Sequence, residues 1–171
     1  MTTSTDLLVD AFGRIREVVE EVVTGLGPEE LAARPDDSAN SIGWLVWHLT
    51  RVQDDHVADA AGTEQVWTAD DWYGRFALPF AAEDTGYGHS RMNVAKVRGL
   101  TAELLTGYHQ AVHDSTVRYV AGIPDKEFTR VVDRSWSPPV TLGVRLISVI
   151  ADGLQHAGQA AYVRGLSAAL G

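Results

Sequence analysis

Three side chains in two distant segments have the types and the spacing of a metal site. Asp152 and His156 are four residues apart in a segment with helical periodicity, so both side chains lie on one helix face. His48 lies in an earlier apolar segment, which is also expected to be helical. One carboxylate and two imidazoles from facing helices leave coordination positions open on a divalent cation, as in catalytic rather than structural zinc sites. The pattern therefore predicts a metal centre that supports chemistry.

A simpler interpretation of the same residues needs no metal. A single histidine on an apolar helix face is more commonly a satisfied core residue than a ligand. Asp152 requires a partner, because an ionised carboxylate among valine and alanine residues is costly to bury unless it is paired or binds a cation. His156 could be that partner through a plain hydrogen bond. Spacing alone leaves the two interpretations equal.

The other histidines of the helical segments are interpreted as peripheral. His109 and His113 are also four residues apart, but they lie off the apolar stripe of their own segment. We therefore expect them at a boundary or solvated face. His56 stands beside Asp54 and Asp55, and we interpret these three residues as the polar end of the helix that contains His48.

Composition narrows the class of protein. The chain has 171 residues, no cysteine and a net charge of -9, and we expect one domain over residues 1–171. Without cysteine there is neither a disulfide nor a thiolate zinc site, so sulfur chemistry requires an external thiol. The acidic balance and the lack of a long basic run argue against nucleic acid as a partner. No apolar stretch approaches the roughly 20 residues that cross a bilayer, and no secretory signal is recognisable, so we expect a cytoplasmic protein without a membrane partner.

Apolar residues recur at helical spacing in four long segments, which predicts an all-α four-helix bundle. Capping residues, glycines and prolines set the expected bounds. The predicted helices run from about Thr5 to Thr24, from a cap at Asn40 or Ser41 to about Ala60, from Leu100 or Thr101 to Gly122, and from Leu142 to Ala169.

Two connections interrupt this pattern. Residues 63–98 are rich in glycine and aromatic residues, and we expect short helical pieces there and a wall over a functional site. His89 in this connection is a candidate acid or base near the mouth of that site. Pro138 and Pro139 predict irregular structure before the last helix.

The resemblance to a known family rests on two segments, "SIGWLVWHLTRVQDDH" and "GVRLISVIADGLQHAGQAAYVRGL". They resemble the DinB-like superfamily of bacterial four-helix bundles, and in particular its actinobacterial mycothiol-dependent branch. The resemblance covers nearly the whole chain. Its most specific elements are a histidine in the second long helix, matched by His48, and an acidic-or-His-x3-His-x-Gly-Gln pattern, matched by Asp152, His156, Gly158 and Gln159.

This resemblance implies a divalent metal bound by His48, Asp152 and His156. Zn²⁺ is the first expectation, and Ni²⁺, Fe²⁺ or Mn²⁺ are alternatives that suit the same ligands. The chain departs from the family in having aspartate where many members have histidine and the related maleylpyruvate isomerases have glutamate. Those isomerases also carry a further C-terminal domain, which favours the S-transferase-like relatives for this chain.

The implied function is a metal-dependent thiol S-transferase. Mycothiol or a similar thiol would bind the metal in place of water, and its sulfur would attack a small electrophile in detoxification or stress. The pocket is expected at the end of the bundle near His48. Three alternatives remain: a non-catalytic metal-binding stress module, a mycothiol-dependent isomerase and a metal-free helical interaction domain. The sequence leaves monomer and homodimer open.

Several residues are candidates for supporting roles. Gln159 could hydrogen-bond a ligand, orient His156, or be only a helix-packing amide. Arg134 and Arg145 could contact an anionic substrate, although surface ion pairing is the simpler interpretation. An aromatic and cationic wall for a sugar-bearing thiol, or equally a loop that covers the core, is predicted for Trp67, Trp72, Tyr73 and Arg75.

Overall fold

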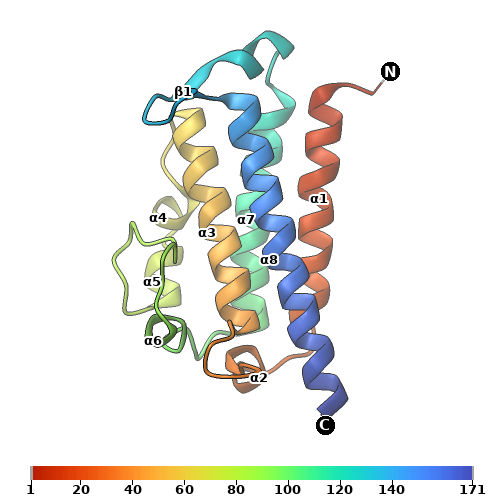
Figure 1. Cartoon of the computed structure of the whole chain (residues 1–171), viewed down its shortest axis with the longest axis vertical. Coiled ribbons are helices and arrows are strands. Elements are labelled where there is room, and N and C mark those ends of the chain that lie inside the picture. The colour runs from red at the N-terminus through yellow and green to blue at the C-terminus, as the bar shows by residue number, and fades with distance from the viewer. Residues whose placement is uncertain (1, 171) are drawn as a thin grey trace.

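Four long helices form a bundle in the computed structural model, which describes residues 2–170 and their side chains up to residue 166 (Figure 1). The predicted all-α four-helix bundle is confirmed. The four helices are α1 (Ser4–Val23), α3 (Ile42–Ala61), α7 (Ala102–Ala121) and α8 (Leu142–Leu170). None of the described helices combines the length and apolarity that a membrane span requires.

The helix ends follow the capping residues of the sequence. The side chain of Ser41 accepts a hydrogen bond from the backbone N–H of Trp44 and so begins α3. Thr101 caps α7 in the same way through the N–H of Leu104. Gly62 ends α3 with a φ of 68°, a left-handed conformation that glycine adopts without strain.

The directions of the helices explain the long connection. The side chain of Gln53 on α3 donates to Thr116 on α7, and further along the same pair the hydroxyl of Tyr119 donates to the carbonyl of Ala60. Both residue numbers rise together, so α3 and α7 are parallel. The chain must therefore return along the bundle between them, as Figure 1 shows.

The connections contain small elements. Three short helices in the return segment confirm the predicted helical pieces, and one more precedes α3. They are α2 (Pro28–Ala32), α4 (Val66–Ala69), α5 (Trp72–Phe76) and α6 (Arg91–Val94). Before α8 the prediction of wholly irregular structure was wrong, because a 3-10 turn and two antiparallel strands form there. The prolines lie in the loop between the strands, where they interrupt no ladder. These elements are η1 (Asp125–Thr129), β1 (Val131–Asp133) and β2 (Val140–Thr141).

Helix α3 is the central element, because 15 of its 20 residues are buried. It packs against α7 and α8, and α1 packs against the same two helices on the other side. A helix buried on most sides must satisfy its polar side chains inside the protein. The buried polar residues of α3 are His48, Thr50, Arg51, Gln53 and Asp54. Their partners lie in α8, α7 and the return segment, so α3 organises the regions that surround the candidate site.

Candidate metal centre

The bundle brings the three predicted ligands together, His48 from α3 and Asp152 and His156 from α8. Their candidate ligand atoms all lie within 4.8 Å of one another, and within the described residues no other group of three histidines or carboxylates does so. The two imidazole centroids are 4.8 Å apart, and Oδ1 of Asp152 lies 3.5 Å from Nε2 of His156. Zinc bonds to nitrogen and oxygen are about 2.0–2.2 Å, so the spacing of these atoms is close to the dimensions of an ion site.

His48 has a defined tautomer. Its Nδ1 lies 2.5 Å from the carbonyl oxygen of Thr85, which can only accept, so Nδ1 carries the proton and Nε2 keeps a lone pair. Trp44 stacks on the imidazole with ring centroids 4.6 Å apart. Burial lowers the pKa of His48 below its ordinary value of 6.5, although the Thr85 carbonyl opposes the shift. The ring is therefore neutral near pH 7, which is the form that binds metals.

His156 is oriented by a residue of its own helix. Its Nδ1 donates to Oε1 of Gln159 at 2.9 Å, which leaves Nε2 for Asp152 and the cluster. The hydrogen bond with Asp152 raises the pKa of His156 above 6.5, against the opposing effect of burial. Of the roles considered for Gln159, the structure therefore favours orientation of the histidine.

Asp152 has one carboxylate oxygen that a bound cation would satisfy. Its Oδ2 atom is buried and has no hydrogen-bond partner among the described residues. Burial raises the pKa of Asp152, but the hydrogen bond with His156 and the charges of His156 and His48 together hold it below the ordinary value. A partly buried, ionised carboxylate with one unsatisfied oxygen, close to two imidazoles, fits a divalent cation, which binds such groups in place of protons.

A cavity of about 480 Å³ adjoins the cluster. It borders His48 as expected, but it extends along the groove between α3 and α8 toward the strands. Arg145 lines it and donates to Asp133 at 2.8 Å, so the interpretation of Arg145 as an ion-pairing residue is confirmed. The lining residues include His48, Val52, Asp55, His56, Thr85, Tyr87, Asp133, Trp136, Arg145, Ser148, Val149 and Asp152.

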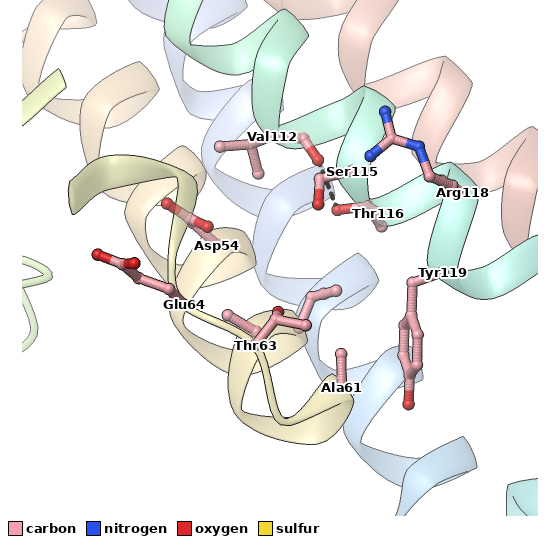
Figure 2. A pocket seen from close by; sticks show the side chains of 11 residues that line it. Asp54, Ala61, Thr63, Glu64, Val112, Ser115, Thr116, Arg118 and Tyr119 are labelled. Carbon is pink, nitrogen blue, oxygen red and sulfur yellow. Dashed lines mark hydrogen bonds between the residues drawn. The ribbon is translucent and has the colours of Figure 1, made fainter. Parts of the chain in front are cut away.

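A second cavity, of about 240 Å³, lies between the C-terminal half of α3 and α7 (Figure 2). Asp54 borders it, but both of its carboxylate oxygens are committed. They accept from the backbone N–H groups of Val66 and Trp67 and from the hydroxyl of Tyr108. Asp54 is thus buried and holds the start of α4, and its assignment to the polar end of α3 was wrong. This cavity lacks the unsatisfied ligands of the first.

The structure does not bring the predicted aromatic wall to the cluster. Trp72, Tyr73 and Arg75 lie on α5, and none of them lines the cavity beside His48. The guanidinium of Arg75 stacks 3.7 Å above the Trp72 ring, and the hydroxyl of Tyr73 donates to the carbonyl of Phe80. These contacts support the alternative of a loop that covers the core, and binding of the thiol by these residues stays a prediction.

Two other histidines are held by hydrogen bonds, and one of them differs from its expected surroundings. His109 is 1% exposed and hydrogen-bonds Thr50, so its placement at a solvated boundary was wrong. Burial lowers its pKa to about 3. His89 accepts from the indole N–H of Trp44 and donates to Asp84, so both ring nitrogens hold the loop, and a role as acid or base stays a prediction.

Sequence reasoning missed three residues near the cluster, Thr85, Arg51 and Trp136. Thr85 acts through its backbone carbonyl, which leaves no signal in the residue type. Arg51 did leave a signal, since it is a charge three residues after His48, within a mostly apolar helical segment. Trp136, which lines the cavity while 67% exposed, falls in a segment without helical periodicity.

Comparison with known proteins agrees with this geometry. Residues 7–169 match the model of a family described as mycothiol-S-transferase. A solved structure of a conserved protein from Enterococcus faecalis is similar to the chain, with 31% sequence identity, 96% of each chain covered and a TM-score of 0.89. Among curated proteins, none matches. The match spans the whole bundle, including all three residues of the cluster, and the chain therefore belongs to the mycothiol-S-transferase family.

Proposed function

We propose that the protein is a metal-dependent S-transferase that joins a low-molecular-weight thiol, such as mycothiol, to a small electrophile. The reaction forms a carbon–sulfur bond, displaces a leaving group from the electrophile and releases the thiol proton. The observation that carries this proposal is the convergence of His48, His156 and Asp152, whose Oδ2 atom has no hydrogen-bond partner among the described residues. Membership of the family supports the thiol and the transfer.

Each residue of the cluster has a definite task. His48, Asp152 and His156 would hold the cation, while Thr85 and Gln159 keep the Nδ1 atoms of the two imidazoles occupied. A bound divalent cation, for which Zn²⁺ is the first candidate and Ni²⁺, Fe²⁺ and Mn²⁺ are alternatives, stabilises the thiolate form of a thiol that otherwise has a pKa of about 8.5. Three protein ligands leave room for an exogenous sulfur.

The adjoining cavity would receive the rest of the thiol. Arg145 is the one lysine or arginine among its lining residues, and it is already paired with Asp133. The cavity wall therefore offers polar groups with little free positive charge. This suits a thiol whose remaining part is uncharged and rich in hydroxyl groups. Trp136 at the rim presents a large exposed aromatic surface for apolar contact with a sugar ring or with the electrophile.

Metal analysis and a conjugation assay test the proposal together. Protein purified without an affinity metal or chelator is expected to contain about one divalent ion per chain and to consume mycothiol in the presence of a fluorogenic alkylating agent. His156→Ala and His48→Ala are each expected to abolish both properties and to retain the helical circular dichroism spectrum.

His113→Ala is the matched control, because it removes an imidazole from α7 that does not belong to the cluster. It is expected to keep the metal and the activity. A wild-type protein that holds no stoichiometric ion would contradict the proposal and support a metal-free helical domain. Metal binding without consumption of any thiol would support the non-catalytic module.

A further inference from the structure

Arg51 is a buried charge in the middle of α3. Its side chain is 0% exposed, and its guanidinium lies 3.7 Å from the carboxylate of Asp54. A buried guanidinium is costly unless its donors are satisfied and its charge is balanced. Nη1 donates to Gln65 and to the hydroxyl of Tyr108, so one side of the fork holds the return segment and α7.

The other side of the guanidinium holds the loop of residues 82–86. Nη2 donates to the carbonyl of Ala82 at 3.2 Å, and Nε donates to the carbonyl of Asp84 at 3.3 Å. A second hydrogen bond closes the loop on itself, because the carboxylate of Asp84 accepts from the N–H of Gly86 at 2.7 Å. The residue between these two anchors is Thr85, whose carbonyl accepts the proton of His48 Nδ1.

The loop matters because the cluster offers an acceptor for the other tautomer of His48. If the proton were on Nε2, it would point toward the cluster, where Oδ2 of Asp152 is buried without a partner among the described residues. A charge-assisted hydrogen bond to that oxygen would be favourable. It would also occupy the lone pair that a metal requires. A carbonyl held firmly at Nδ1 is what opposes this arrangement.

We propose that Arg51 is a positioning residue, which fixes the tautomer of His48 through the loop of residues 82–86. Arg51 touches neither the cluster nor the adjoining cavity. By holding the loop, Arg51 keeps the Thr85 carbonyl at Nδ1 of His48, so that Nδ1 and not Nε2 carries the proton. The tautomer is a property of the metal-free protein, whereas the consequence for metal affinity rests on the proposed function.

Nitrogen-15 NMR of the histidine rings in metal-free protein at pH 8 tests this directly, because long-range proton–nitrogen spectra distinguish the two neutral tautomers. His48→Gln assigns the signal. The wild type is expected to show His48 protonated at Nδ1. Arg51→Lys keeps the charge beside Asp54, but it loses the planar fork that reaches two carbonyls. It is expected to move a large fraction of His48 to the Nε2 tautomer and to weaken Zn²⁺ binding by about 10- to 100-fold.

Gln53→Met is the matched control, since it removes a buried hydrogen bond from the same helix to Thr116 without contacting the loop. It is expected to lower the melting temperature and leave the His48 tautomer unchanged. If Arg51→Lys does not fold, Asp84→Ala loosens the same loop from its outer side and is expected to produce the same tautomer shift.

The possible results separate the two proposals. A folded Arg51→Lys protein with the wild-type tautomer overturns the positioning role, as does a wild-type His48 that is protonated at Nε2. An unchanged tautomer in Asp84→Ala overturns it where Arg51→Lys cannot be measured. A tautomer shift in a protein whose wild type binds no Zn²⁺ leaves the positioning role intact and rejects the proposed function.

Discussion

Gln159 and His156 form a hydrogen bond of 2.9 Å between residues three apart on α8, and this bond directs Nε2 of the imidazole toward Asp152. Replacement of Gln159 by leucine is expected to free the ring and to weaken metal binding by about 10- to 100-fold, the usual cost of losing such a supporting contact. Competition with a chelator measures the affinity. Gln155→Leu is the control, because among the described residues the Gln155 side chain bonds only the Ala151 carbonyl of its own helix. Equal losses in both variants would show that the contact does not matter.

Two glycines of the loop beside His48 permit a stricter comparison. Gly86 and Gly88 both have positive φ, of 88° and 72°, so alanine is strained by about 1–2 kcal/mol at either position. A Cβ at position 86 would also lie 2.9 Å from Nδ1 of His48 and 2.9 Å from the Trp47 ring, whereas at position 88 it would meet nothing within 4 Å. Gly86→Ala is therefore expected to lower the free energy of unfolding by about 1–3 kcal/mol more than Gly88→Ala does, and to be the one variant that loses metal affinity.

Urea denaturation measures the stability of the two variants, and metal titration measures their affinity. Similar results for the two variants would contradict the close approach of Gly86 to His48.

His109 predicts how stability depends on pH. Its pKa is about 3 in the folded protein and near 6.5 when exposed, so the unfolded chain binds more protons between these values. Its contribution to stability is complete above about pH 6.5 and is lost as the pH falls, by up to about 1.4 kcal/mol per pH unit. Urea unfolding of metal-free protein between pH 7.5 and 4.5 should therefore show a steeper decline for the wild type than for His109→Gln. The cluster histidines titrate in both proteins and cancel in the difference, so parallel profiles would be evidence against a buried neutral His109.

The ion pair in the cavity predicts where the thiol binds. Arg145→Met leaves Asp133 without its 2.8 Å partner and alters the cavity wall, while the three cluster residues stay in place. We expect the KM for mycothiol to rise about tenfold, because the unpaired Asp133 carboxylate becomes costly to desolvate when the thiol enters the cavity, with metal content unchanged. Arg134→Met is the control, because this neighbouring arginine is exposed and does not line the cavity. An unchanged KM in Arg145→Met would place the thiol elsewhere, and the α5 residues Trp72, Tyr73 and Arg75 would then be the next to test.

The amino-acid sequence determined the long helices and the identity of the cluster. Helical periodicity and local caps such as Ser41 and Thr101 act within one turn, so they can be recognised without the fold. The four-residue spacing of Asp152 and His156 likewise places both side chains on one face of a single helix. His48 was identified by its family pattern, and the bundle brings it to the other two residues.

Only the tertiary structure decided what surrounds these residues. His109, Asp54 and Arg51 are polar side chains whose burial depends on the elements packed against α3 and α7. Their positions in the sequence favoured the surface for the first two, because His109 lies off the apolar stripe of its helix and Asp54 lies in a polar run. The carbonyl of Thr85 reaches His48 because a loop 37 residues away in the chain folds back against α3. Backbone groups are the same at every position, so the contact that sets the tautomer of the candidate ligand has no trace in the order of the amino acids.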